Sequence, residues 1–442
     1  MTEVRGTDGP GPSWGRRAVE RGLGLLRSPA LVYLGAAVLA RVASVVLVPL
    51  YTRVLTQEEY GELAIVNSVI LTLSSVLALG TQAAVSRMYF DGEAGAAAAR
   101  RAGSVARWTL ALGVLMSLAL LPVIPFLTKA GSLWRSPLGL GCTLVGALGA
   151  VLVSVPSNFY RAAQLPVRAA TVDLLTFLAT LLPALLMVGG LKMGLRGAIL
   201  GLGGGGALCA LAGAITILRW PGATWDPSLL KGILWFSLPL TPHLLAAQIL
   251  GVGDRWVLAA FGATASLGIL SLASQITSPA GMVLSAWNEM ESARLGEALR
   301  SGGRRGLRDA LPYSVRTYLA SSAVSSLGTL ALLPLVTLVV GTKFWGAFWL
   351  VPALLACGLI DVFYYPANAA LVYTDRTREL PPITLVSGLV GLGANALLIP
   401  LLGTWGVILA RAITLSVRSG LTVARAMVAL RNVGDPEERI VP

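Results

Sequence analysis

Apart from Arg425, near the end of the last apolar stretch, five charged side chains lie within the long apolar stretches of this 442-residue chain: Arg41, Asp173, Asp361, Arg411 and Arg418. At the centre of a membrane each charge would cost on the order of 2.5 to 3.5 kcal/mol, so such residues are usually paired or functional. Three are arginines and two are aspartates, so at least one guanidinium needs a different counter-ion. A guanidinium binds phosphate through two parallel hydrogen bonds. The pattern therefore predicts a site for a phosphate-bearing anion.

Spacing places several of these groups together on helical faces. Arg411 and Arg418 are seven residues apart, which puts both on one face of a helix. Asp361 shares a face with Tyr364 and Asn368. Two interpretations of Asp361 stay equally open: it joins helices by pairing with an arginine, or it binds a coupling cation. Structural pairing is the favoured interpretation of Asp173, with ion coupling as its alternative, because that residue lies near the end of its apolar stretch.

Polar side chains form a second group of candidates. They could hydrogen-bond a sugar, or they could join helices to each other, which we expect of most of them. The candidates for substrate binding in this group are Asn67, Gln248, Gln275 and Asn368, together with Arg255, which follows Asp254 between two apolar stretches. The chain's one histidine, His243, could relay protons, although a packing role is favoured.

Composition indicates a membrane protein that crosses the bilayer many times. Hydrophobic residues make up 55% of the chain and charged residues 12%, with a mean hydropathy of +0.75, whereas about 25% of a soluble protein is charged. The net charge of +13 is spread among connections, so we expect no nucleic-acid partner. The three cysteines lie far apart in apolar stretches, and neither a metal site nor a disulfide is expected.

Counting apolar runs gives the predicted topology. Crossing about 30 Å of hydrocarbon takes roughly 20 helical residues. Twelve runs qualify: 30–51, 63–86, 108–128, 137–160, 170–190, 197–218, 232–253, 264–287, 317–341, 347–372, 382–401 and 405–428. Most of the 34 Lys and Arg residues fall in connections on the side of the N-terminus. The positive-inside rule therefore predicts an inner-membrane protein with both termini in the cytoplasm.

The predicted fold class is an all-α polytopic membrane protein with about twelve transmembrane helices in two six-helix lobes. Residues 28–218 would form the first lobe and 232–430 the second, joined by a connection at 219–231 and flanked by cytoplasmic tails at 1–27 and 431–442. Because six is even, the lobes would share one orientation and be related by a pseudo-two-fold axis along the membrane normal, with a cavity between them. Arg53 with Arg255, and Gly61 with Gly268, are weak echoes of such a duplication.

The connections offer few other sites. Asp254 and Arg255 are predicted to lie at the turn between the spans 232–253 and 264–287. The longest connection, 289–316, is basic and is predicted to be a plain cytoplasmic loop, or else an amphipathic segment on anionic headgroups. The glycine run at 201–206 lacks the following Lys-Ser/Thr of a phosphate-binding loop, so close helix packing is favoured.

Two stretches resemble a known family. PLYTRVLTQEEYGELAIVNSV at 49–69 is similar to the first loop and second helix of polysaccharide flippases, which move lipid-linked oligosaccharides such as O-antigen units. The Pro-containing span, Asp254-Arg255, Gly268 and the polar helix that follows resemble the start of the second half of the same proteins. They belong to the multidrug/oligosaccharidyl-lipid/polysaccharide exporter (MOP) superfamily, and the resemblance covers about residues 28–431.

The resemblance implies a transporter rather than an enzyme. Its substrate would be a polyprenyl-diphosphate-linked glycan, moved by alternating access of the two lobes. No ATP-binding motif is present, so an H⁺ or Na⁺ gradient would drive it without a bound cofactor. Membrane lipids and a glycan polymerase are the expected partners of a monomer. Alternatives are a drug/cation antiporter of the same superfamily, a membrane polysaccharide polymerase or ligase, and a flippase of peptidoglycan precursors.

Overall fold

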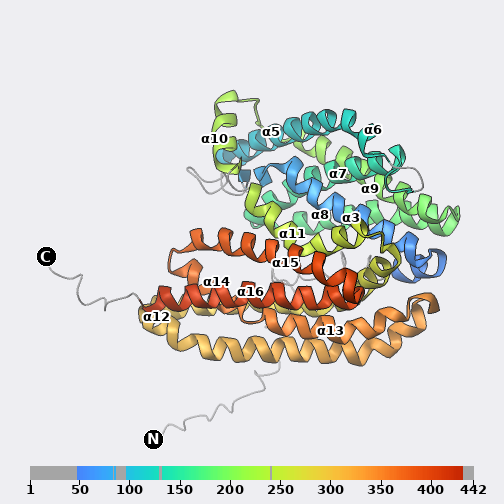
Figure 1. The fold of residues 1–442 in the computed structure, drawn as a ribbon. Helices are drawn as coiled ribbons and strands as arrows, with labels where there is room; N and C mark the ends of the chain where they lie inside the picture. Colours follow the sequence, from blue (N-terminus) through green and yellow to red (C-terminus); the bar gives the residue numbers. More distant parts are fainter. Residues whose placement is uncertain (1–46, 83, 86–95, 129–131, 239–240, 432–442) are drawn as a thin grey trace, which may run out of the picture.

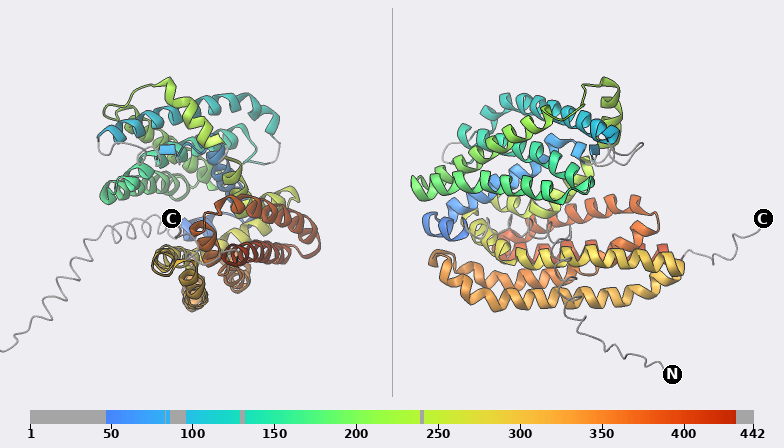
Figure 2. Two further views of the ribbon diagram at one scale, coloured as in Figure 1. Left: turned by 90° about the vertical axis from the view of Figure 1, so that its left-hand side faces the viewer. Right: turned by 180° about the vertical axis from the view of Figure 1, so that it is seen from behind.

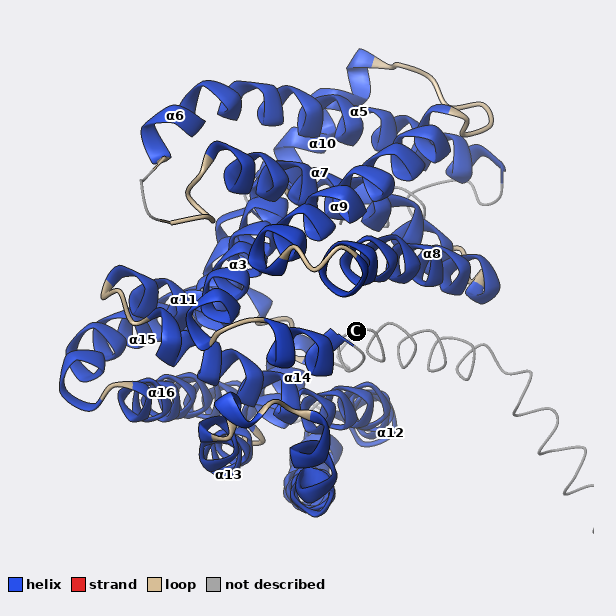
Figure 3. Cartoon of the chain, turned by 90° about the vertical axis from the view of Figure 1, so that its right-hand side faces the viewer, coloured by secondary structure: helices blue, strands red, loops and turns tan. Residues whose placement is uncertain are grey.

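The computed structural model describes residues 47–82, 84–85, 96–128, 132–238 and 241–431. These residues form helices, with no strand among them (Figures 1 and 3). Ten helical stretches in the described ranges are long and apolar enough to cross a membrane. The predicted span 30–51 lies mostly outside those ranges, and the predicted span 232–253 is divided between two helices. The chain is a multi-pass membrane protein with the predicted all-α architecture of two lobes (Figure 2).

The first lobe, which we call the N lobe, forms the upper half of Figure 1. It begins with a helical segment at 47–54. Its other elements are α3 (Gln57–Ala78), α5 (Ala96–Leu120) with its continuation through η1 (Leu121–Val123) and α6 (Ile124–Leu127), α7 (Pro137–Ala162), α8 (Pro166–Ala184) with the π-helical η2 (Leu185–Gly190), and α9 (Gly194–Leu218).

Glycines bring the helices of the N lobe into backbone contact. A Cβ atom on Gly149 of α7 would lie 2.2 Å from the carbonyl oxygen of Gly206 on α9, and a Cβ on Gly206 would lie 2.5 Å from the Cα of Gly146. A Cβ on Gly203 would lie 2.6 Å from Cys142 Sγ. Small residues allow this approach between membrane helices. The glycine run at 201–206 is therefore a packing surface, as predicted.

The second lobe, the C lobe, forms the lower half of Figure 1. Its elements are α11 (Thr241–Ala260), α12 (Thr264–Val339), η4 (Thr342–Phe344), α13 (Gly346–Asp361), α14 (Tyr364–Tyr373), η5 (Thr377–Glu379), α15 (Leu380–Leu402) and α16 (Thr404–Arg431). The helix before α11, α10 (Pro227–Ser237), packs on the N lobe, where Ile233 is fully buried among side chains of α5, α7 and α9.

α12 is two antiparallel helices joined at Gly303, whose positive φ of 58° ends the first and allows the chain to reverse. Ser314 Oγ donates to Glu291 Oε1 at 2.7 Å, and Tyr318 OH donates to Asn288 Oδ1 at 2.7 Å across the hairpin. The prediction of a loop at 289–316 was wrong, because the charges there lie on helical faces. Helices of 40 and 35 residues span about 60 and 50 Å, which exceeds the membrane's hydrocarbon core.

The two lobes meet at a seam between α3 and α12, and its geometry is reciprocal. A Cβ on Gly61 would lie 2.0 Å from Thr264 O, while a Cβ on Gly268 would lie 2.1 Å from Gln57 O. Each glycine thus contacts the residue four positions before the other, as a pseudo-two-fold axis through the seam requires. The predicted correspondence between Arg53 and Arg255 was wrong. Arg53 is the second-last residue of its helix, whereas Arg255 lies five residues before the end of α11.

Candidate functional site

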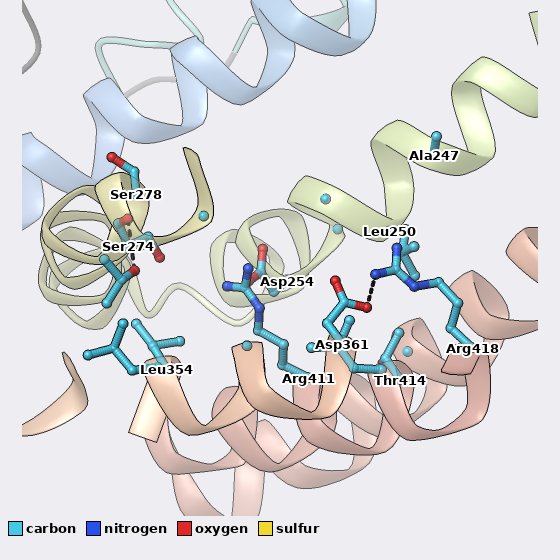
Figure 4. Close-up of a pocket in the computed structure, with 18 of the residues that line it drawn as sticks. Ala247, Leu250, Asp254, Ser274, Ser278, Leu354, Asp361, Arg411, Thr414 and Arg418 are labelled. Carbon is cyan, nitrogen blue, oxygen red and sulfur yellow. Dashed lines mark hydrogen bonds and ion pairs between the residues drawn. The ribbon is translucent and has the colours of Figure 1, made fainter. Parts of the chain in front are cut away.

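A cavity of about 470 Å³ lies within the C lobe, lined by α11, both halves of α12, and α13 to α16 (Figure 4). Five charged residues line it: Asp254, Arg255, Asp361, Arg411 and Arg418. Three cations and two anions leave one net positive charge. The sequence predicted a cavity between the two lobes, but every residue that lines this cavity belongs to the C lobe. We call this space the C-lobe cavity.

α16 supplies two of the arginines. Arg411 and Arg418 lie two turns apart on its inward face with Thr414 between them, as their spacing predicted. Arg411 has no ion-pair partner among the described residues, and Figure 4 shows its guanidinium group on the side of Asp254. One guanidinium in the C-lobe cavity is therefore available to an anion.

Arg418 forms an ion pair with Asp361 of α13, and each side chain is 16% exposed. The guanidinium also lies 4.3 Å from the ring centroid of Tyr364, a cation–π contact. Its Nε is buried without a hydrogen-bond partner. The hydroxyl of Tyr364 in turn donates to Asn368 Oδ1 at 3.4 Å. Asp361, Tyr364, Asn368 and Arg418 thus form one polar cluster. Asp361 and Arg418 line the cavity, whereas Tyr364 and the substrate-binding candidate Asn368 are not among its lining residues.

Asp254 and Arg255 lie inside a helix and not at a turn, which corrects the expectation from sequence. α11 continues to Ala260, and the chain turns at Gly262, where φ is +71°. Asp254 Oδ1 accepts a hydrogen bond from the backbone N–H of Arg255 at 2.7 Å. A helix can carry both charges through a membrane because they face a polar cavity rather than lipid.

Neutral polar groups complete the lining, and the sequence reasoning missed most of them. Asn395 of α15 donates through Nδ2 to Gly391 O at 2.8 Å, while its Oδ1 is buried without a partner. Hydroxyls come in pairs four residues apart, Ser274 with Ser278 and Ser322 with Ser326. That spacing puts each pair on one helical face, and it was the signal in the sequence that could have identified them.

The other candidates for substrate binding lie outside the C-lobe cavity. Asn67 is exposed on α3 and donates to Leu63 O of its own helix at 3.1 Å. Gln275 accepts from Tyr60 OH at 3.0 Å, a contact between the two lobes. Gln248 is half-buried on α11 and does not line the cavity. Arg41 lies outside the described residues, as does the side chain of His243.

Asp173 is placed in the N lobe, away from the C-lobe cavity. Arg161 Nη2 donates to its Oδ2 at 2.7 Å, and Ser157 Oγ donates to its Oδ1 at 3.0 Å. The Arg161 side chain is 53% exposed and that of Asp173 is 21% exposed. Asp173 is therefore paired with an arginine, as predicted from its position near the end of its apolar stretch.

Solved structures show what the fold resembles. The chain aligns with a multidrug resistance MATE family transporter of the MOP superfamily in an inward-facing conformation, with a TM-score of 0.70 and 17% identity over 92% of this chain and 100% of that one. A multidrug resistance MATE family transporter in an outward-facing conformation aligns with a TM-score of 0.60 and 17% identity, over 91% of this chain and 94% of that one. A MOP superfamily transporter from Pyrococcus furiosus, whose binding pocket is described as having reverse polarity, aligns with a TM-score of 0.55 and 17% identity, over 92% of this chain and 95% of that one.

These likenesses show that the chain has the fold of MOP superfamily transporters, as its two resembling stretches predicted. No protein of curated function matches the chain significantly. The profile of one family, described as polysaccharide biosynthesis protein, matches residues 26–289, which is more than half of the chain. The chain therefore belongs to the polysaccharide biosynthesis protein family.

Proposed function

We propose that this protein moves a lipid-diphosphate-linked oligosaccharide across the cytoplasmic membrane during polysaccharide biosynthesis. The observation that carries the proposal is Arg411, a guanidinium that lines the C-lobe cavity and has no ion-pair partner among the described residues. Membership of the polysaccharide biosynthesis family supports the glycan, and the MOP fold supports transport.

The charge balance of the C-lobe cavity suits a diphosphate. A diphosphate carries at least two negative charges, and burying them unpaired in a low-dielectric space would be prohibitive. Arg255 and Arg411 can contact it while Asp361 still holds Arg418, because arginine stays charged at any physiological pH and presents a planar fork to two oxygens. The serine hydroxyls and Asn395 Oδ1 offer hydrogen bonds to the sugars nearest the phosphate.

The ion pair between Asp361 and Arg418 supplies a means of coupling transport to an ion gradient. If Asp361 takes a proton or a sodium ion, Arg418 is released to a phosphate. If Asp361 keeps Arg418, the cavity holds the substrate less tightly. Substrate and coupling ion therefore act through one charge network, and the driving ion is H⁺ or Na⁺ in this proposal. Ion coupling through Asp173 is not favoured, because Arg161 and Ser157 already satisfy its carboxylate.

Alternating access would require the seam to open. Besides the glycine contact, Gln57 donates to the Lys343 carbonyl oxygen, and the Gly341 N–H donates to Thr52 Oγ1 at 3.2 Å. These contacts lie on the side that the positive-inside rule assigns to the outside. Separating them would open the space between the lobes outward, with each lobe moving as a unit.

Replacing Arg411 tests the proposal. In a strain that depends on this protein for surface polysaccharide, the Arg411→Ala variant should lower export by about ten- to a hundredfold, as expected for losing ~1.5 to 3 kcal/mol of a charged hydrogen bond. Arg411→Lys should restore export only in part, because lysine lacks the planar fork. Surface glycan, normalised to membrane protein level, is the measurement.

Arg425 provides the matched control. It lies seven residues beyond Arg418 on α16, but it is outside the cavity, and its 63% exposed side chain is 3.8 Å from Glu379. Arg425→Ala should export within about twofold of wild type, because exposed ion pairs contribute ~1 kcal/mol or less. Wild-type export by Arg411→Ala at equal protein level would contradict the proposal.

A drug/cation antiporter is the second candidate, and Asp254 and Asp361 in the cavity are the observation that favours it. A cation would be repelled by Arg411, so an antiporter should tolerate or gain from Arg411→Ala. Measured drug resistance that depends on the protein and survives this substitution, together with unchanged surface glycan, would favour the antiporter.

The orientation and partners belong to the same proposal. We place the protein in the cytoplasmic membrane as a monomer with both termini inside, supplying glycan to a polymerase on the outer face. Reporter fusions after Val54, at the seam, and after Leu307, near the tip of the α12 hairpin, should report opposite sides of the membrane. Activity of both reporters on one side would contradict the topology.

A further inference from the structure

A second cavity, of about 800 Å³, lies at one end of the N lobe. The first turns of α5 and α8, the last turns of α7 and α9, and the turn at 220–222 line it. Residues 132–136 and the connection at 191–193 lie at the opposite end of the same helices. We call this space the N-lobe end cavity, and it is separate from the C-lobe cavity that carries the proposed glycan site.

Three arginines line the N-lobe end cavity: Arg100, Arg168 and Arg219. Among the described residues, no aspartate or glutamate lines the cavity and none of the three arginines has an ion-pair partner. The neighbouring Arg161 differs, because it is held by Asp173 at 2.7 Å. Three guanidinium groups around one cavity, with no carboxylate among its described lining residues, form a site for an anion.

Packing holds the turn at 220–222 in place at the wall of the N-lobe end cavity. Trp220 is buried, with its ring 4.4 Å from that of Phe159 and against Gly103, where a Cβ would lie 2.6 Å from the indole. The turn then continues to Gly222, whose φ is +69°. A Cβ atom at this position would lie 2.5 Å from Arg100 Cδ, so the absence of a side chain leaves room for the Arg100 methylene groups. A side chain at position 222 would displace Arg100 from the cavity.

The beginning of α8 adds a partial positive charge. Arg168 is in its first turn, and the N-cap residue Leu165 has no side chain that could accept from the first N–H groups. The positive end of a helix dipole favours anions in its first turn. Arg168 and the helix terminus thus act in the same direction on a ligand in the N-lobe end cavity.

Tryptophans indicate that this end of the lobe lies among lipid headgroups. Trp108 donates through Nε1 to Asp226 O at 3.0 Å and packs edge-on with Trp225, ring centroids 5.5 Å apart. Trp225 is 48% exposed, and Trp235 on α10 is 84% exposed. Such aromatic residues gather at the membrane–water interface, and basic pockets between helices at that level suit anionic lipids.

We propose that the N-lobe end cavity binds the phosphate of an anionic phospholipid headgroup. The phosphate is contacted by Arg100, Arg168 and Arg219. The net negative charge of the lipid distinguishes it from zwitterionic lipids. The positive-inside rule assigns this end to the cytoplasmic leaflet. The site does not depend on the identity of the transported substrate, so it stands or fails independently of the glycan.

The test measures lipid binding to the purified full-length protein in detergent. Phosphatidylglycerol is titrated and the thermal unfolding midpoint is followed; phosphatidylethanolamine is the zwitterionic comparison. Phosphatidylglycerol should raise the midpoint in wild type, and the triple variant Arg100→Gln, Arg168→Gln, Arg219→Gln should require roughly 100-fold more of it. If the triple variant does not fold, Arg168→Gln alone should require about fivefold more.

A matched control separates the site from general charge. Arg53, Arg135 and Arg196 lie at the opposite end of the N lobe, and their triple glutamine variant loses the same charge. This control should keep the wild-type response to phosphatidylglycerol. An equal loss in both triple variants, or no loss in the first, overturns the proposal. An equal response to millimolar inorganic phosphate would show that the site takes free phosphate, and the lipid assignment would then fail.

Discussion

The last helices of the two lobes, α9 and α16, hold corresponding places, but they present different residues to their surroundings: glycines on α9 and arginines on α16. α9 packs on α7, and α16 packs on α13. α9 presents Gly203, Gly206 and Gly213 to its neighbours, with Cβ positions blocked at 2.5 to 2.6 Å. α16 presents Arg411 and Arg418 to a cavity. The face of α9 toward its neighbours is thus filled by backbone contact, whereas the face of α16 toward the cavity carries charge.

This difference indicates how a duplicated fold can divide its work. Helices that touch through glycine leave no room for a guanidinium group, so the centre of the N lobe is a close-packed scaffold. Arg411 and Arg418 on α16 and Arg255 on α11 line a space that water or a ligand can fill. The charge network can then change its pairing while the N lobe keeps its packing.

The largest expected effect comes from filling the glycine contact. Gly149→Ala places a methyl group 2.2 Å from a carbonyl oxygen on α9, so the helices must separate. Overpacking costs ~1 to 3 kcal/mol or more, and little folded protein should remain. The measurement is the yield of monodisperse protein and its thermal unfolding midpoint.

Two glycines beside the C-lobe cavity and on α16 supply the contrast, whereas Gly391 and Gly406 of the same lobe are in close contact, with Cβ positions 2.6 Å from Thr414 Oγ1 and 2.2 Å from Leu398 O. A Cβ at Gly358 on α13 or at Gly420 on α16 would meet nothing within 4 Å. Gly358→Ala and Gly420→Ala should therefore keep the wild-type midpoint, or raise it slightly because alanine favours helix. Equal damage from alanine in both lobes would show that the lobes are packed alike, contrary to the comparison.

A smaller effect is expected from the ion pair of Asp361 with Arg418. Asp361→Asn removes the carboxylate and leaves Arg418 free to hold phosphate, so transport should lose its dependence on the ion gradient while binding of a lipid diphosphate remains. Because both side chains retain 16% exposure, the stability loss should stay below the ~3 to 5 kcal/mol of a fully buried broken pair. Export and the binding constant are measured on the same variant.

The matched change in the N lobe is Asp173→Asn, which breaks the pair with the exposed Arg161. It should leave gradient dependence unchanged and alter stability by ~1 kcal/mol or less. If Asp173→Asn uncouples transport and Asp361→Asn does not, the charge network that matters lies in the N lobe and the assignment made here is reversed.

The sequence was enough to predict the helical membrane fold, because long apolar runs have one stable form in lipid. It also predicted the face shared by Arg411 and Arg418, since seven residues make two turns. The pairing of Asp361 with Arg418 was one of two interpretations that the sequence left open, because helix partners depend on tertiary contacts.

Other features could not be found by counting apolar runs. Such counting ends a span at a charge, so Asp254 was assigned to a turn although α11 continues to Ala260. It also treats a charged stretch as a loop, whereas residues 289–302 and 305–316 continue the two helices of α12, which are longer than the hydrocarbon core of a membrane. The location of the cavity within the C lobe depends on which helices pack together. Packing partners, such as Gly391 with Thr414, cannot be read from the sequence.

The smallest expected effect tests the neutral groups of the C-lobe cavity. Asn395 Oδ1 is buried, faces no protein donor and lies on a helix that lines the cavity. If it accepts a hydrogen bond from the substrate, Asn395→Ala should lower export about two- to fivefold, as expected for ~0.5 to 1 kcal/mol. Ser387 is the control, because it is fully buried on the same helix, donates to Ile383 O at 2.7 Å and does not line the cavity. Ser387→Ala should leave export unchanged, with any cost confined to the unfolding midpoint. If the two variants export equally and differ only in stability, Asn395 joins helices, and the cavity recognises its substrate by charge alone.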